Sequence, residues 1–234
     1  RRLGARRDGE DVSWASYTLF GKPDFSPPKQ PAIAPKRLTD RSPYRWLHYY
    51  EEEDEHIFYG RDTETRLFVE TLRNYPIVVL QGESGVGKSS FLRAAVKPAL
   101  RREGGLIVVA ELGAKDPIQS IVRNINDQAL KELEQPLRPP PSVSGLSAFL
   151  VSLKSKLPSP RLYVFLDQVE RFVLDASSTS KQKLVTFIDD VIESTLPRGL
   201  DVRFVLSIRH DYFSSVYELL DSSQNDFRPV HLHY

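Results

Sequence analysis

A glycine-rich loop limits what this sequence can fold into more than any other feature does. Residues 82–89 read Gly-Glu-Ser-Gly-Val-Gly-Lys-Ser, the complete G-x-x-x-x-G-K-[ST] pattern, directly after the apolar run at 77–80. Such a turn between a strand and a helix wraps successive backbone N–H groups around phosphate oxygens, and the helix N-terminus adds a positive partial charge. Because glycine tolerates unusual backbone conformations, Gly82, Gly85 and Gly87 are expected to let the loop take this shape. The pattern predicts a nucleotide site.

The loop residues have distinct expected roles. Lys88 is expected to reach the β- and γ-phosphates as a point charge, and the hydroxyl of Ser89 is a candidate ligand for Mg²⁺. The alternative is a glycine-rich turn that carries a lysine by chance, but the helix-like segment at 91–96 argues against it. The predicted nucleotide contacts in this stretch are Gly82, Glu83, Ser84, Gly85, Val86, Gly87, Lys88, Ser89 and Ser90.

Three charged residues near strand ends are candidates for the second half of this site. Asp167 ends the apolar run at 162–166 and is expected to hold Mg²⁺ opposite the serine hydroxyl, directly or through water. Glu170 is a candidate to orient or deprotonate the attacking water. Arg209 follows the next predicted strand and is a candidate to reach the γ-phosphate. The alternatives are an ordinary turn aspartate, a solvated loop glutamate and a surface arginine.

Strands and helices alternate along most of the chain. Apolar periodicity predicts helices at 62–74, 89–102, 117–133, 145–157 and 181–195, and strands at 77–80, 106–110, 162–166, 202–208 and 230–234. Alternation of elements of this length implies an α/β fold in which a parallel sheet is sandwiched between helices.

The chain is expected to have three parts. Residues 1–21 contain a strand-like segment too short for a domain, and we interpret them as the remnant of a preceding effector domain. Residues 22–43 hold six prolines and are predicted to form an extended linker. Residues 44–234 form the predicted nucleotide-binding domain. Because the sequence contains no Met, the chain is expected to be a piece of a longer protein.

Composition narrows the possible partners. The 234 residues are 40% hydrophobic and carry a net charge of +1, so the overall balance indicates neither a nucleic-acid nor a membrane partner. The absence of Cys excludes disulfides, thiolate zinc sites and a cysteine nucleophile within the chain. No apolar stretch approaches the length needed to cross a bilayer, and the cytoplasm is the expected location.

Two polar clusters receive no role in the predicted site. The acidic run at 51–55 is interpreted as a solvated face, and the alternatives are a helix cap or contact with a neighbouring protomer. His210, and the pair His231 and His233, lack convincing metal-ligand spacing, and the pair is interpreted as decoration of a strand.

These motifs together resemble the STAND class of signal-transduction NTPases. Residues 43–45, 51–54 and 58–64 resemble the lead-in P-Y-x-G-L…E-E-D…F-F-G-R-x-x-E of that class, and residues 82–100 resemble its G-x-S-G-x-G-K-S-S-L-L-R-A…P-A-L. Residues 166–170 are similar to L-x-D-Q-F-E-E, and residues 207–212 to a strand that ends in R-x-D-[FY]. The resemblance covers the chain from residue 43 to about its end.

The resemblance implies an ATP-driven switch that hydrolyses ATP slowly with Mg²⁺. In that class the nucleotide domain lies between an N-terminal effector and a C-terminal sensor, and it oligomerises when a trigger ligand engages the sensor. Gly60 and Arg61 are expected to approach the base and sugar. Trp46 and Arg171 depart from the pattern, which argues against fast hydrolysis. A winged-helix unit and the sensor are expected beyond residue 234.

Residues 12–23 also resemble the closing strand of caspase-like CHAT domains, which end in W-x-x-F-x-L-x-G-x-P. The preceding effector would then be protease-like, and an aromatic edge strand of another domain is the alternative. Two other functions stay open for the nucleotide domain. One is a small-molecule kinase, with the Pro-rich segment and residues 145–157 as a substrate lid, and the other is a nucleotide-binding scaffold without hydrolysis.

Overall fold

The computed structural model describes residues 48–112, 116–133 and 146–233, all of which belong to the compact unit Pro43–Tyr234. Several sequence-based expectations lie outside these ranges. They are the effector remnant at 1–21 with its CHAT resemblance, the linker at 22–43, the departure at Trp46 and the first residue of the helix expected at 145–157.

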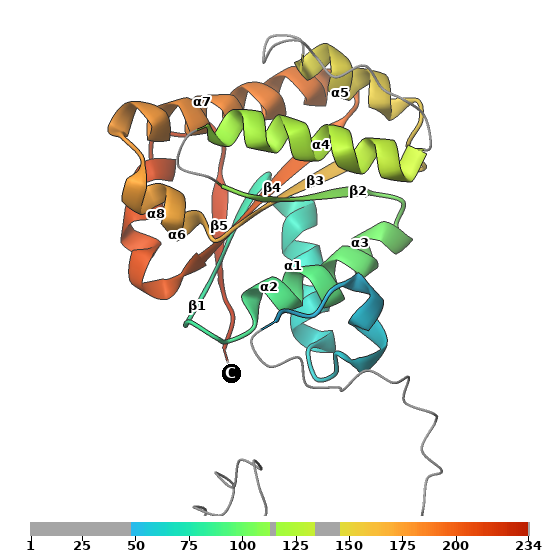
Figure 1. Cartoon of the computed structure of the whole chain (residues 1–234). Coiled ribbons are helices and arrows are strands. Elements are labelled where there is room, and N and C mark those ends of the chain that lie inside the picture. The colour runs from blue at the N-terminus through green and yellow to red at the C-terminus, as the bar shows by residue number, and fades with distance from the viewer. Residues whose placement is uncertain (1–47, 113–115, 134–145, 234) are drawn as a thin grey trace, which may run out of the picture. The chain divides into compact units, whose positions relative to one another are not determined.

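Five parallel strands form one sheet within the described ranges (Figure 1). They are β1 (Ile77–Gly82), β2 (Leu106–Glu111), β3 (Arg161–Asp167), β4 (Asp201–Arg209) and β5 (Phe227–His231). Their order across the sheet is β2-β3-β4-β1-β5, and all four neighbouring pairs are parallel. The carboxyl ends of all five strands therefore meet at one edge, where ligands bind in open α/β sheets.

The strands are apolar because both faces of the sheet are covered. Ile77 and Val79 of β1 pack into one hydrophobic cluster, whereas Val78 and Leu80 pack into the other. Successive side chains of a strand point to opposite faces, so an uninterrupted apolar run fits a strand that is buried on both sides.

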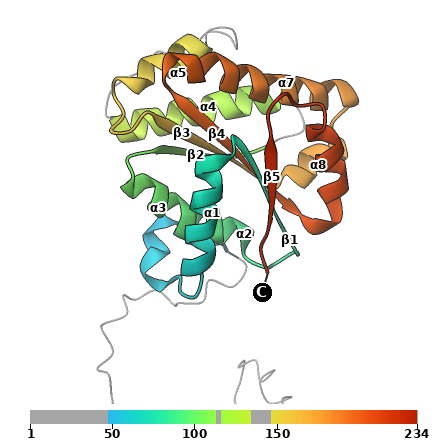
Figure 2. The ribbon, with the colours of Figure 1, turned by 180° about the vertical axis from the view of Figure 1, so that it is seen from behind.

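Helices form a layer on each face (Figures 1 and 2). The larger cluster joins the sheet to α4 (Pro117–Leu133), α5 (Leu146–Lys154), α6 (Val169–Asp175), α7 (Ser178–Thr195) and α8 (Phe213–Leu220). The smaller cluster joins it to α1 (Asp62–Asn74) and to a continuous helix made of α2 (Lys88–Ser90), a π-helical segment η3 (Phe91–Val96) and α3 (Lys97–Arg102). The predicted α/β fold with a sandwiched parallel sheet is thus confirmed.

Most predicted elements are confirmed, including the helices at 62–74 and 117–133 with the same bounds. The short helices η2 (Glu52–Ile57), α6 and α8 were not predicted. The last strand was predicted at 230–234, but β5 begins at Phe227, ends at His231 and contains Pro229. Proline is tolerated there because β5 is an edge strand.

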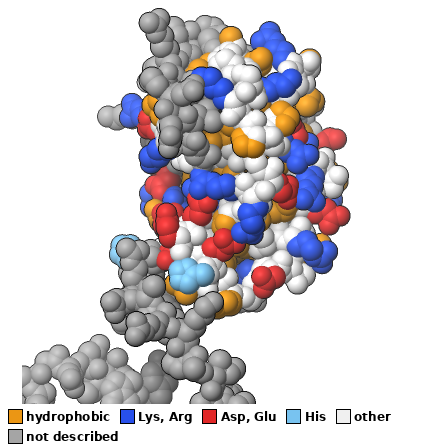
Figure 3. All heavy atoms as spheres, turned by 90° about the vertical axis from the view of Figure 1, so that its right-hand side faces the viewer, with side chains coloured by type: hydrophobic (Ala, Val, Ile, Leu, Met, Phe, Trp, Pro, Cys, Tyr) orange, Lys and Arg blue, Asp and Glu red, His pale blue; other side chains and the backbone are white. Residues whose placement is uncertain are grey.

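Basic and acidic side chains are interspersed on the face shown in Figure 3. Such groups also pair: the carboxylate oxygens of Glu103 lie 2.6 Å from Arg73 and 3.7 Å from Arg161. Within the three described ranges, no helix combines the length and the apolar character that a membrane crossing requires.

Candidate functional site

A cavity of about 730 Å³ lies at the carboxyl end of the sheet and is lined by residues from both halves of the predicted site. Its lining residues are His48, Tyr49, Tyr50, Phe58, Tyr59, Arg61, Ser84, Gly85, Val86, Gly87, Lys88, Ser89, Ser90, Asp167, Gln168, Glu170, Ser207 and Arg209. The fold therefore brings together most of the residues that the sequence singled out. Gly60, Gly82 and Glu83 are predicted contacts that do not line the cavity.

The glycines of the loop have different structural roles. Gly85 and Gly87 adopt φ values of 80° and 91°, a left-handed region that other residues rarely enter. Gly82 does not, and a glycine is needed at this position for a different reason. A Cβ atom on Gly82 would lie 2.7 Å from the carbonyl oxygen of Leu232, so this glycine allows the chain after β5 to pass close to the loop.

Lys88 begins the helix after the loop and is folded back onto the loop itself. Its Nζ donates to the carbonyl oxygens of Gly82 and Glu83, each at 2.8 Å. Burial lowers the pKa of the Lys88 ammonium, and the carboxylates of Glu170 and Asp167 oppose this shift. A half-buried ammonium that lines the cavity is suited to bind an anionic ligand.

Asp167 and Glu170 lie on either side of the junction between β3 and α6. Asp167 is buried at the end of β3, and its Oδ1 accepts from the backbone N–H of Gln168 at 3.0 Å. Gln168 has a φ of 56°, a left-handed turn that ends the strand and begins the helix. Glu170 follows in the first turn of α6, and its Oε2 is buried without a hydrogen-bond partner among the described residues.

The end of β4 contributes two further polar side chains. Arg209 pairs through Nη2 with Asp211, while its Nε is buried and has no partner within the described part of the chain. The Oγ of Ser207 is equally buried and unpartnered there. Such groups are rare in folded proteins, and three of them, including Glu170 Oε2, line one cavity. Ser207 was not predicted, although it is the polar residue inside an otherwise apolar strand end.

Aromatic residues form the other part of the cavity lining. We call His48, Tyr49, Tyr50, Phe58 and Tyr59 the aromatic wall. The rings of Tyr50 and Phe58 pack with centroids 5.5 Å apart. Arg61 lines the cavity beside the wall and pairs with Glu64 at 3.0 Å, and Gly60 provides a left-handed turn with a φ of 85°. The sequence prediction included Gly60 and Arg61 but missed the aromatic wall. The signal that could have revealed the wall is the group of aromatic residues on either side of the acidic run.

One family model covers the part of the chain that contains the STAND-like motifs quoted above. The family model described as "Novel STAND NTPase 1" matches residues 43–230 of the chain. The chain belongs to the novel STAND NTPase 1 family. The cavity at the glycine-rich loop therefore lies in a STAND-type P-loop NTPase domain. No curated protein sequence matches the chain.

Solved structures share the fold of this STAND domain at low sequence identity. A Walker-type ATPase of Pyrococcus abyssi is 18% identical with a TM-score of 0.56, over 80% of this chain and 56% of that one. The Aeropyrum pernix ORC2 protein, solved in ADPNP-ADP complexes, is 17% identical with a TM-score of 0.50, over 75% and 48%. Drosophila ORC bound to DNA is 14% identical with a TM-score of 0.53, over 74% and 30%. The chain thus spans about half the length of the first two.

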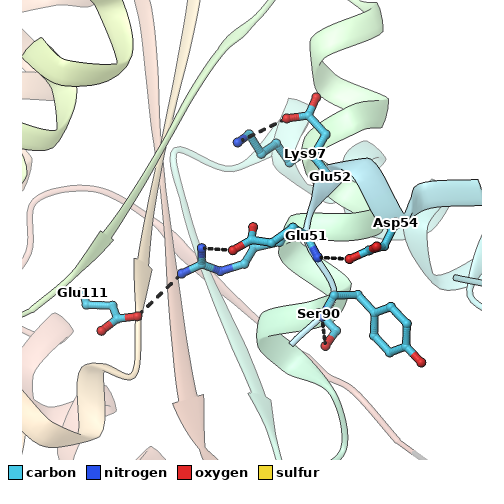
Figure 4. Close-up of polar contacts among 8 residues, drawn as sticks. Glu51, Glu52, Asp54, Ser90, Lys97 and Glu111 are labelled. Atoms are coloured by element: carbon cyan, nitrogen blue, oxygen red, sulfur yellow. Dashed lines mark hydrogen bonds and ion pairs between the residues drawn. The ribbon is translucent and has the colours of Figure 1, made fainter. Parts of the chain in front are cut away.

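The acidic run of this STAND domain is only in part a solvated face: Glu53 and Glu55 are exposed, whereas Asp54 is buried. Three of its five carboxylates pair with cations on the helix after the loop, and Figure 4 shows part of this cluster. Asp54 is buried and forms a capping box with Glu51 at the start of η2, so the helix-cap alternative holds for this residue. The ion pairs are Glu51 with Arg93, Glu52 with Lys97 and Arg101, and Glu55 with Arg102.

Proposed function

We propose that this domain binds ATP with Mg²⁺ and hydrolyses it slowly, as the timing element of a molecular switch. The observation that carries the proposal is the convergence of the loop, Asp167, Glu170 and Arg209 on one cavity that holds three unpartnered buried polar groups. Unpartnered buried groups cost free energy unless a ligand or water satisfies them. The phosphate oxygens of a nucleoside triphosphate can accept hydrogen bonds from Lys88 and Arg209.

The polar residues of the cavity fit Mg²⁺. Ser89 and Asp167 supply a hydroxyl and a carboxylate, which are the hard oxygen donors that this ion prefers. Among the described residues, no group of three or more ligating side chains could hold a metal ion alone. Mg²⁺ usually binds through one or two carboxylates together with phosphates and waters, so a two-residue donor set suits an ion that arrives with the nucleotide. When bound, the ion neutralises charge on the phosphates.

Glu170 and Arg209 are the candidates for the hydrolytic step. Glu170 lines the cavity, and its carboxylate is the candidate to accept a proton from an attacking water. Arg209 ends β4, which lies between β3 and β1 in the sheet, so it stands beside both the carboxylate and the loop. Its guanidinium is suited to stabilise charge that spreads over the γ-phosphate oxygens.

The role as a switch rests on family membership. STAND-type architecture suggests that the nucleotide domain couples a sensor to an attached effector in signalling or defence, and that the full-length protein oligomerises on activation. A change of nucleotide state can drive such coupling only if the two states differ in their interactions with ATP and ADP. In the full-length protein, light scattering with ATP and the activating ligand is expected to show assembly, and a persistent monomer would contradict it.

The proposal is tested by turnover with and without small-molecule acceptors. A switch ATPase is expected to consume ATP slowly and at the same rate when sugars, nucleosides or amino acids are added. A strong increase caused by one acceptor would favour the kinase alternative. Tight ATP binding without any release of phosphate would favour the scaffold alternative.

A further inference from the structure

Arg93 contacts three residues that come from two other parts of the chain. It lies in η3, on the helix that begins with Lys88, and its side chain is largely buried. Its guanidinium carbon lies 4.2 Å from the ring centroid of Tyr49. Its Nη1 lies 3.3 Å from Glu51 Oε1, and its Nη2 lies 3.6 Å from Glu111 Oε1 (Figure 4).

Two of these contacts fix the segment that carries Tyr49 and Tyr50 of the aromatic wall. Residues 49–51 belong to no helix or strand, so hydrogen bonds of regular secondary structure do not hold them. Arg93 binds this segment at Tyr49 and Glu51, and between them the backbone N–H of Tyr50 donates to Ser90 Oγ at 3.1 Å. All these anchors lie on the helix that follows the phosphate-binding loop.

The third contact reaches the sheet. Glu111 ends β2 and is the register partner of Asp167 at the end of β3. Arg93 therefore connects the wall segment, the helix after the loop and the strand end beside the buried carboxylate. A planar guanidinium can stack on a ring and bind two carboxylates at once, which a lysine ammonium cannot do.

We infer that Arg93 is a positioning residue that holds Tyr49 and the adjoining aromatic wall in place as the surface against which the nucleotide base packs. This inference rests on the proposed nucleotide binding and adds the base-binding end of the same cavity. Stacking between a base and an aromatic ring strengthens binding by about fivefold or more for each base. Arg93 itself does not line the cavity and acts through Tyr49.

The inference predicts an effect on ligands that carry a base and none on ligands that lack it. Binding of Mg-ATP and of Mg-tripolyphosphate is measured by titration calorimetry for the wild type and for Arg93→Ala, with circular dichroism to verify folding. Arg93→Ala is expected to weaken ATP binding at least about fivefold and to leave tripolyphosphate binding unchanged. Equal weakening of both ligands, or of neither, would overturn the inference.

Further variants separate positioning from a general loss of stability. Tyr49→Phe keeps the ring that Arg93 covers and is expected to behave as wild type, whereas Tyr49→Ala reproduces the effect of Arg93→Ala. Glu51→Gln removes one ion-pair partner and is expected to weaken ATP binding in the same selective way. The matched control is Arg73→Ala, which breaks an ion pair with Glu103 away from the cavity and should change neither ligand.

Steady-state kinetics provide a second readout when tripolyphosphate binds too weakly to titrate. Arg93→Ala is expected to raise the KM for ATP at least about fivefold while kcat stays within about twofold. A fall in kcat at unchanged KM would contradict the inference. Failure of the wild type to bind ATP at all would instead refute the proposed function, so the two failures are distinguishable.

Discussion

The Nζ of Lys88 donates to the carbonyl oxygen of Gly82 at 2.8 Å, so the lysine of the phosphate-binding loop is bound by the loop that contains it. Together with the bond to Glu83, this contact keeps a half-buried cation in place within the cavity. A phosphate that binds Lys88 then meets a side chain that is already ordered, which lowers the entropy lost on binding.

The lowered pKa of Lys88 predicts that ATP affinity declines at alkaline pH. Only the ammonium form attracts phosphate, and burial makes Lys88 lose its proton below the ordinary lysine value of 10.5. Affinity is therefore present at neutral pH and is lost as the pH rises through the lowered pKa. Titrations between about pH 7 and pH 10 measure this. Lys97→Ala, outside the cavity, should leave the midpoint unchanged, whereas an affinity that stays constant up to pH 10.5 would contradict the assignment.

Glu170→Gln is expected to slow hydrolysis without weakening ATP binding. The amide keeps the size of the side chain but cannot accept a proton, and loss of a general base costs about 10²- to 10⁴-fold. Single-turnover release of phosphate measures the rate, and calorimetry measures the binding. Asp175→Asn is the matched control, because Asp175 is an exposed carboxylate at the end of the same helix and does not line the cavity. Unchanged turnover in Glu170→Gln would remove this residue from the mechanism.

Gly82→Ala is expected to destabilise the fold. The new Cβ would lie 2.7 Å from the Leu232 carbonyl and 3.0 Å from Val86 Cγ1, and overpacking of this kind costs about 1–3 kcal/mol. Urea unfolding followed by circular dichroism measures the change in the free energy of unfolding. Ser214→Ala on the exposed side of α8 should change it by less than about 0.5 kcal/mol. A Gly82→Ala protein as stable as the wild type would show that the chain after β5 moves aside.

The sequence predicted the loop and the fold because both depend on contiguous patterns. The strand, loop and helix around Lys88 are adjacent in the chain, and Asp167 directly ends an apolar run. The ion pairs of the acidic run could not be predicted, because their partners lie 42 to 49 residues further along the chain. The aromatic wall was missed for a related reason, since part of it lies on irregular backbone that lacks a periodic pattern.

The histidines at the carboxyl edge of the sheet predict a loss of stability in mild acid. The rings of His210 and His231 stack 5.1 Å apart, and those of His231 and His233 lie 4.2 Å apart. Burial lowers the pKa of His231, with contributions from both neighbouring histidines and from Lys88, while Glu83 opposes the shift. A lowered pKa in the folded state means that stability is present above about pH 6.5 and is lost as the pH falls below it.

His231→Asn is expected to reduce this dependence on pH. Urea midpoints measured at about pH 7.5 and pH 5.5 should differ less in the variant than in the wild type. His56→Asn serves as the control, because His56 lies in η2 and outside this histidine group. The same pH dependence in wild type and His231→Asn would contradict the prediction.

The central claim is that the cavity at the carboxyl end of the sheet binds ATP through Lys88. Calorimetric titration of Mg-ATP into the wild type and into Lys88→Ala tests it most directly, because loss of a charge-assisted hydrogen bond weakens binding by about 10- to 150-fold. We predict measurable binding to the wild type and binding that is weaker by at least about 10-fold in Lys88→Ala, with both proteins folded. Equal affinity in the two proteins, or no binding to the wild type, would contradict the account.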